Sequence, residues 1–243
     1  MKRSGIFLTA LMFFLLISGM AYALPALQLD IVDGEYDTGT ETTVATTNPF
    51  TLQALIDPSI YGSDATFYLS IALMPQTSES VDVGSIVFNG TTIDVTGDMV
   101  YGTAPLEQLA SLQGFDAGDL KHGIFETYFY EYEFDLSSRT SVAAYDVQTG
   151  EPKANSTLYL VAFEVDTSNL AGGYQVHFDL YTTELGKLIT SLNGDEFYDV
   201  DIDAFAPFSH DAESGPPVPE PATLILLGAG LIGLAGFRKK LNK

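Results

Sequence analysis

Strict alternation of large apolar residues is the feature that most constrains the fold of this chain. From Phe67 to Leu73 every second residue is a large apolar one, and from Tyr128 to Phe134 every second residue is aromatic. Because successive side chains of a strand point to opposite faces, each stretch predicts a strand with one apolar face. Residues 157–165 and 174–182 are also rich in apolar residues and predict two further strands.

Shorter strand and turn signals occupy much of the remaining chain. Asn89-Gly90 is the strongest hairpin signal, because both residue types tolerate the positive φ angles of a two-residue turn. Leucines at every third position predict one helix over residues 105–113, with Pro105 in its first turn and Gly114 at its end. Weaker strands are predicted at residues 27–32, 50–56, 85–88, 91–95, 141–147 and 197–202.

About ten short strands separated by turn residues predict an all-β fold with one short helix. The expected architecture is a single antiparallel β-sandwich, of jelly-roll or immunoglobulin-like type, over residues 24–205. A polar stretch that ends in Pro and Gly predicts a linker over residues 206–217. The chain has no cysteine, so disulfides do not stabilise this domain.

The N-terminus has the three parts of a secretory signal peptide. Two basic residues are followed by an apolar stretch over residues 6–20, and Ala21 and Ala23 flank a tyrosine in the small-x-small pattern of a cleavage site. We therefore predict a signal peptide over residues 1–23 and a mature chain that begins at Leu24. The alternative is an anchor that is not cleaved.

The C-terminus carries a second apolar segment. Residues 222–237 contain no charge, and a helix of this length covers about 24 Å, somewhat less than the roughly 30 Å of a bilayer's hydrocarbon core. Its four glycines are common in membrane helices, and the basic residues after Phe237 favour a cytoplasmic end. The pattern predicts a short transmembrane helix, which Pro219, Glu220 and Pro221 precede.

This order of Pro-Glu-Pro, short apolar helix and basic end resembles the PEP-CTERM sorting signal, here over residues 218–243. The resemblance implies a bacterial envelope protein that an exosortase recognises transiently and processes. It further implies a precursor tethered to the inner membrane and a product at the cell surface or outside the cell. The alternative is an ordinary membrane anchor that stays in place.

The body of the chain resembles the family called choice-of-anchor N. The stretches that carry this resemblance are residues 27–31, 48–52, 68–73, 122–129 and 177–182. The resemblance implies a secreted protein whose relatives share a body and differ in their surface anchors. It implies no enzymatic activity.

The charge of the predicted mature part limits its partners. Between Leu24 and Pro217 there are 31 acidic and four basic residues, a formal charge of −27. A surface this acidic repels nucleic acid and anionic lipid headgroups, so neither is an expected partner.

Three aspartates form the best candidate for a metal site. Asp199, Asp201 and Asp203 alternate along the chain, so an extended strand would project their carboxylates from one face, as calcium sites require. The pattern is not an EF-hand, because Ala204 and His210 stand where glycine and glutamate are needed. The alternative is an acidic solvent face on an edge strand.

Other constellations give little support to catalysis. His122, His177 and His210 have none of the spacings typical of zinc enzymes, and no hydrolase or nucleotide-binding motif occurs. The tyrosines of residues 128–132 are interpreted as one face of the sandwich, with a sugar-stacking platform as the alternative.

The predicted function is therefore non-enzymatic: a structural or interaction role at the surface or in an extracellular polysaccharide matrix such as a biofilm. The second hypothesis is a carbohydrate-binding module, either calcium-dependent or calcium-independent. A glycoside hydrolase with paired carboxylates is the third.

Overall fold

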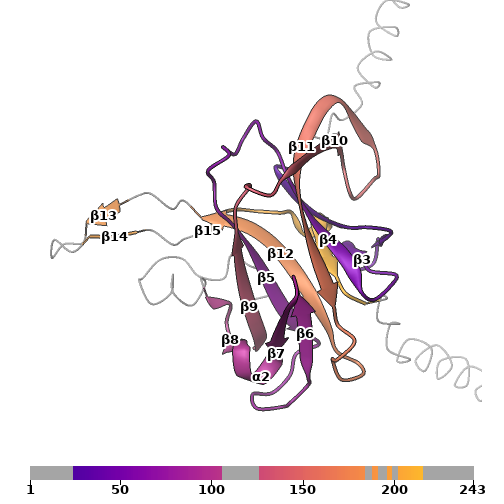
Figure 1. Cartoon of the computed structure of the whole chain (residues 1–243), viewed down its shortest axis with the longest axis vertical. Coiled ribbons are helices and arrows are strands. Elements are labelled where there is room, and N and C mark those ends of the chain that lie inside the picture. The colour runs from indigo at the N-terminus through magenta and orange to yellow at the C-terminus, as the bar shows by residue number, and fades with distance from the viewer. Residues whose placement is uncertain (1–23, 106–125, 184–187, 191–195, 199–201, 216–243) are drawn as a thin grey trace, which may run out of the picture.

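The computed structural model describes residues 24–105, 126–183, 188–190, 196–198 and 202–215 (Figure 1). Most of these residues lie in β-strands that form two large sheets. The β-rich, two-sheet architecture predicted from the alternating pattern is confirmed, and the jelly-roll or immunoglobulin-like type stays a prediction.

The smaller of the two sheets has six strands and is built around the long strand β11. In it β4 lies between β1 and β11, β6 joins β11 to β7, and β10 pairs with β11 outside this path. All of these pairs are antiparallel. The strands are β1 (Leu27–Ile31), β4 (Phe50–Ile56), β6 (Ser85–Phe88), β7 (Thr91–Asp94), β10 (Thr140–Tyr145) and β11 (Pro152–Asp166).

The larger sheet has eight strands in the order β2-β3-β16-β12-β5-β9-β8, with β15 also paired to β12. Its one parallel pair among the described strands joins β16 to β3. The strands are β2 (Glu35–Asp37), β3 (Thr42–Val44), β5 (Phe67–Met74), β8 (Val100–Gly102), β9 (Thr127–Phe134), β12 (Gln175–Thr183), β15 (Ile202–Phe205) and β16 (Asp211–Glu213). Two further strands, β13 (Leu188–Thr190) and β14 (Glu196–Tyr198), pair only with each other among the described residues.

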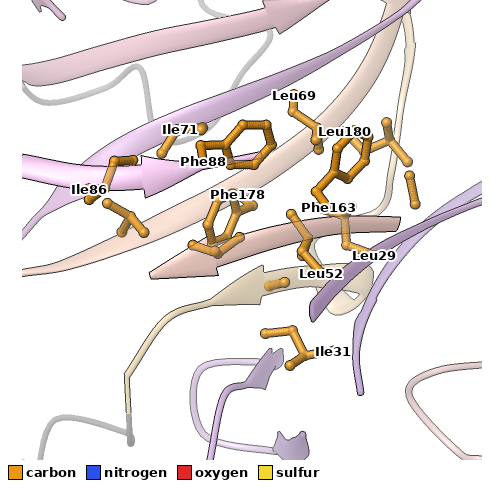
Figure 2. Close-up of a cluster of buried hydrophobic side chains, with 14 of the residues drawn as sticks. Leu29, Ile31, Leu52, Leu69, Ile71, Ile86, Phe88, Phe163, Phe178 and Leu180 are labelled. Atoms are coloured by element: carbon orange, nitrogen blue, oxygen red, sulfur yellow. The ribbon is translucent and has the colours of Figure 1, made fainter. Parts of the chain in front are cut away.

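The hydrophobic core lies between the two sheets (Figure 2). Leu29 and Leu52 reach it from the six-stranded sheet, while Leu69 and Phe178 reach it from the eight-stranded sheet, and all four are fully buried. Removing such a side chain from water contributes about 1.5–3 kcal/mol. The core is therefore the main reason why the two sheets stay together.

Helical structure is short in the described part of the chain. The helix α2 (Val95–Asp98) follows β7, and its N-cap Asp94 accepts a hydrogen bond from the Gly97 backbone N–H at 2.7 Å. The described ranges also contain the 3₁₀ turn η2 (Phe208–His210). In the described ranges we find no helix that is long and apolar enough to cross a membrane.

Several sequence predictions fall where the structure gives no description. Outside the described residues lie the signal peptide over residues 1–23, nearly all of the helix predicted at 105–113, and the sorting tail over 218–243. The linker prediction for 206–217 can be compared in part. Residues 211–213 form β16, which pairs with both β12 and β3, so this stretch belongs to the sheet instead of linking it to the tail.

Candidate functional site

The eight-stranded sheet is buried on both faces near its centre. In β12 the even-numbered residues from Val176 to Leu180 point into the core. The odd-numbered His177, Asp179 and Tyr181 therefore point to the other side, which we call the outer face. Their exposed fractions are 0%, 6% and 0%, so these polar residues are as buried as the core.

The neighbouring strand β16 adds two acidic residues to the outer face. His177 lies opposite Glu213 in the antiparallel register, and Asp211 is two residues before Glu213, so both acids share the face of His177. Asp211 is 2% exposed and Glu213 is 4% exposed. Acidic residues are almost never this buried unless they are paired. We refer to His177, Asp179, Asp211 and Glu213 as the acid–histidine cluster.

The two nitrogens of His177 have different environments. Nδ1 lies 3.2 Å from Glu213 Oε1, a hydrogen-bond distance. Nε2 lies 3.6 Å from Asp179 Oδ1 and 3.8 Å from Asp211 Oδ2, both longer than a hydrogen bond. Gln175 Nε2 donates to the second oxygen of Glu213 at 3.3 Å and so helps to hold this carboxylate in place.

The ligand atoms on the Nε2 side converge. One nitrogen of His177 and one carboxylate oxygen each from Asp179 and Asp211 all lie within 4.8 Å of one another. Asp211 Oδ1 is buried and has no hydrogen-bond partner in the described part of the chain. Such a group could hold a divalent cation, since imidazole and carboxylates are common metal ligands.

Burial and mutual proximity shift the proton affinities within the cluster. Burial raises the pKa of Asp211 to about 8, and the negative charge of Asp179 acts in the same direction, while His177 opposes it. For His177 burial lowers the pKa, but the nearby carboxylates, Asp179 first, outweigh burial and hold the pKa well above its ordinary value. Without a bound cation, the cluster therefore retains protons that these groups would lose in water.

A small apolar cluster lies beside these charges on the outer face. Tyr181 stacks on Tyr68 with ring centroids 5.5 Å apart, and both pack with Phe129 and two alanines. The Tyr181 hydroxyl donates to Glu131. Burial, followed by the charge of Glu131, raises the pKa of Tyr181 well above its ordinary value, so the phenol stays protonated.

The second described histidine has a simpler environment. His210 Nε2 lies 3.6 Å from Asp146 Oδ1, and Nδ1 lies 2.9 Å from the Ser209 hydroxyl. Burial lowers the pKa of His210, although Asp146 opposes this shift. His210 is 3% exposed, so it is a buried histidine beside one acid, whereas His177 faces three.

The residues predicted from the sequence as sites lie largely elsewhere. Several of them are outside the described residues: Ala21 and Ala23, the motif Pro219, Glu220 and Pro221, and also Asp199 and Asp201. Asp203 lies in β15, and nothing is described of its side chain. The calcium hypothesis for the three aspartates therefore stays a prediction.

The tyrosine run of β9 is placed clearly. Tyr128 is 3% exposed and belongs to the core between the sheets, and Tyr130 and Tyr132 pack against that core. The interpretation of these residues as one face of the sandwich is supported, and the run does not form an exposed platform for sugar rings.

Sequence reasoning missed the acid–histidine cluster. Its residues form two short patterns, His-x-Asp in β12 and Asp-x-Glu in β16, each of which places two polar side chains on one face of a strand. In a linear sequence both patterns are typical of an exposed strand face. Only the pairing of β12 with β16 brings them together.

Comparisons with known proteins identify the tail. A family model described as the PEP-CTERM protein-sorting motif matches residues 217–240, which implies an exported protein sorted by an exosortase. No curated protein matches. A solved structure titled BspA_C_WT is 12% identical, and the similarity covers 78% of this chain and 50% of that one, so the match spans about half of its length. Its TM-score of 0.23 does not indicate a shared fold. The resemblance of the body to choice-of-anchor N stays a prediction.

Proposed function

We propose that this chain is a non-enzymatic envelope protein with a structural or interaction role at the cell surface or in the extracellular polysaccharide matrix. The observation that carries this proposal is the sorting motif at residues 217–240. The motif concerns delivery, and the role of the delivered part is inferred from the character of the folded domain.

The physical character of the tail supports a temporary anchor. Residues 222–237 are short for a bilayer and contain four glycines, so they would hold the precursor in the inner membrane weakly. Pro219 and Pro221 disfavour helix at the residues before them and would keep Glu220 outside the membrane helix. An exosortase could then reach the Pro-Glu-Pro segment.

The folded domain supports a role in interaction more than in catalysis. Its concentrated titratable groups, the acid–histidine cluster, are 0–6% exposed, so a substrate has no direct access to them in this structure. The excess of acidic residues over basic ones keeps separate copies apart and would make the surface hydrated and soluble. These are useful properties for a protein embedded in a polysaccharide matrix.

The experiment is fractionation of cells, followed by intact-mass measurement, with and without the exosortase. We expect the wild type outside the cell, beginning at Leu24 and shorter by about the last 20–25 residues, which corresponds to the segment from the Pro-Glu-Pro residues to Lys243. Glu220→Ala should leave a full-length form in the membrane fraction. Glu151→Ala, which changes an exposed glutamate of the folded domain, is the matched control and should be exported like the wild type.

Two results would contradict this proposal. A wild type that stays full length and membrane-bound in both strains would make the tail a permanent anchor. A purified, processed protein that hydrolyses polysaccharides would contradict the non-enzymatic role, even if sorting occurs as expected.

A further inference from the structure

We propose that the outer face of the eight-stranded sheet holds one zinc ion, ligated by His177 Nε2 and by carboxylate oxygens of Asp179 and Asp211, with Glu213 orienting the imidazole. This inference is independent of how the protein is sorted. It concerns residues that come from two strands, β12 and β16, both of which belong to one sheet.

The distances within the group fit ligands of a shared ion. Ligand atoms about 2.1 Å from a tetrahedral zinc ion lie roughly 3.4 Å from one another. His177 Nε2 is 3.6 Å from Asp179 Oδ1 and 3.8 Å from Asp211 Oδ2. These separations are too long for hydrogen bonds, and side-chain shifts of a few tenths of an ångström would bring the atoms to ligand positions.

The other side of the imidazole has the partner that a metal-bound histidine needs. When Nδ1 donates its proton to Glu213 Oε1, at 3.2 Å, Nε2 can carry a lone pair toward Asp179 and Asp211. Histidines that bind metals almost always donate their second ring N–H to a carboxylate, a backbone carbonyl or water. Gln175 holds Glu213 in turn, so the orientation of His177 is supported by two successive contacts.

A second, independent observation comes from unpartnered polar atoms. Asp211 is 2% exposed, and its Oδ1 has no hydrogen-bond partner among the residues that are described. Ser70, the cross-strand neighbour of Asp179 on β5, is fully buried and its Oγ likewise has no described partner. Buried polar groups are normally satisfied. A cation that Asp211 binds through both carboxylate oxygens would satisfy Oδ1 as well as Oδ2, the oxygen that lies 3.8 Å from His177 Nε2.

Charge gives the third argument. Three carboxylates face one imidazole at the centre of a sheet, and a buried charge is costly unless it is compensated. A divalent cation on the Nε2 side would offset two of the negative charges directly.

The mixture of ligand types selects zinc over calcium. Calcium takes six to eight oxygen ligands, whereas this group offers one nitrogen and few oxygens. Imidazole suits zinc and other transition metals, and zinc accepts His and Asp ligands in a four-coordinate arrangement. The calcium ion predicted from the sequence for Asp199, Asp201 and Asp203 would therefore differ in type from the zinc ion proposed here.

The test is zinc binding by the full-length chain, purified in detergent after treatment with chelator, so that its outcome does not depend on sorting. With zinc chloride as the probe, isothermal titration calorimetry should show one zinc ion per chain, bound more tightly than calcium or magnesium. Asp211→Asn keeps the size of the side chain and should weaken zinc binding by at least about 100-fold. Glu213→Gln should weaken it by about 10–100-fold, the range found for residues that orient a ligand.

The second buried histidine supplies a matched control. Asp146→Asn removes one negative charge beside His210, at the same 3.6 Å separation as in the proposed site, and should leave zinc affinity unchanged. The proposal is wrong if the folded wild type takes up no zinc, if it prefers calcium, or if Asp211→Asn binds zinc like the wild type.

A spectroscopic measurement on the wild type tests the proposal without any variant, so its result does not depend on whether the variants fold. Cobalt chloride, which substitutes for zinc in such sites, should produce the intense visible absorption of a four- or five-coordinate Co²⁺ ion. Added zinc should abolish this absorption. The absence of any cobalt spectrum, or a weak spectrum typical of six water-like oxygen ligands, would overturn the assignment.

Discussion

The two faces of β12 are equally buried but chemically opposite. On the core face, Phe178 and Leu180 are fully buried among apolar side chains of both sheets (Figure 2). On the outer face, His177 and Asp179 are 0% and 6% exposed beside two further acids. One strand therefore separates a region stabilised by the hydrophobic effect from a region that burial alone would destabilise.

Burial therefore has opposite consequences for the stability of the two faces. Each large apolar side chain on the core face contributes stability by leaving water. Each charge on the outer face must regain from its neighbours what it lost in hydration, so the acid–histidine cluster depends on its composition, protons and ions. The core face should accordingly respond to changes of volume, and the outer face to changes of charge and pH.

The largest expected effect is a cavity on the core face. Phe178→Ala should lower the free energy of unfolding by about 3–5 kcal/mol, because the fully buried ring leaves space that the surrounding side chains cannot fill. Chemical denaturation at two pH values measures this loss. Because Phe178→Ala removes no titratable group, the loss should be the same at both pH values. A loss that changed strongly with pH would contradict the comparison between the faces.

The next effect concerns pH and belongs to the outer face. The folded protein holds a proton on Asp211 up to a pKa of about 8, and it holds one on His177 above the ordinary range. Between about pH 5 and pH 8 the unfolded chain has lost protons that the folded chain retains. The free energy of unfolding should therefore fall as pH rises, by at most about 1.4 kcal/mol per pH unit for each proton.

Denaturation in the presence of chelator from pH 5 to pH 8 measures this slope. Asp211→Asn should flatten it, whereas Glu151→Gln, which changes the overall charge equally at an exposed position, should not. Stability that rises with pH in the wild type would show that the carboxylates of the outer face are ionised and well paired without a cation.

A smaller effect is expected from the hydrogen bond at the edge of the charged region. Tyr181→Phe removes the hydroxyl that donates to Glu131 and should cost about 1.5–3 kcal/mol, the range for hydrogen bonds to charged groups. Thermal unfolding measures the change. An unchanged stability would mean that Glu131 is satisfied equally well by water and that this part of the outer face is less demanding than its burial suggests.

The smallest effect involves a neutral group on the same face. Thr127→Val removes the hydroxyl that donates to the Leu73 carbonyl at 2.8 Å, while it preserves the volume and β-branching of the side chain. The expected loss is about 1 kcal/mol. Measured with the same assay, a loss as large as that of Tyr181→Phe would show that charge is not what distinguishes the outer face.

The parts of the fold that the sequence predicted are those with local signals. The alternating stretches became β5 and β9, and the Asn89-Gly90 signal became the turn between β6 and β7, with φ angles of 50° and 77°. The short strands β2 and β3 escaped prediction because three residues carry too little pattern. The strand β16 was interpreted as linker, because its acidic sequence conceals how deeply it is buried.

The amino-acid sequence by itself determined where the strands with strong alternation form, which of their faces is apolar, and that the tail carries a sorting motif. These properties depend on neighbouring residues, and a period of two or a tripartite tail can be read along the chain. Tertiary structure alone decided that His177 and Asp179 meet Asp211 and Glu213, since they lie on strands joined only by long-range pairing. It also decided that the outer face is buried, because the same alternation of polar residues describes a solvated face or a covered one until the rest of the chain has folded.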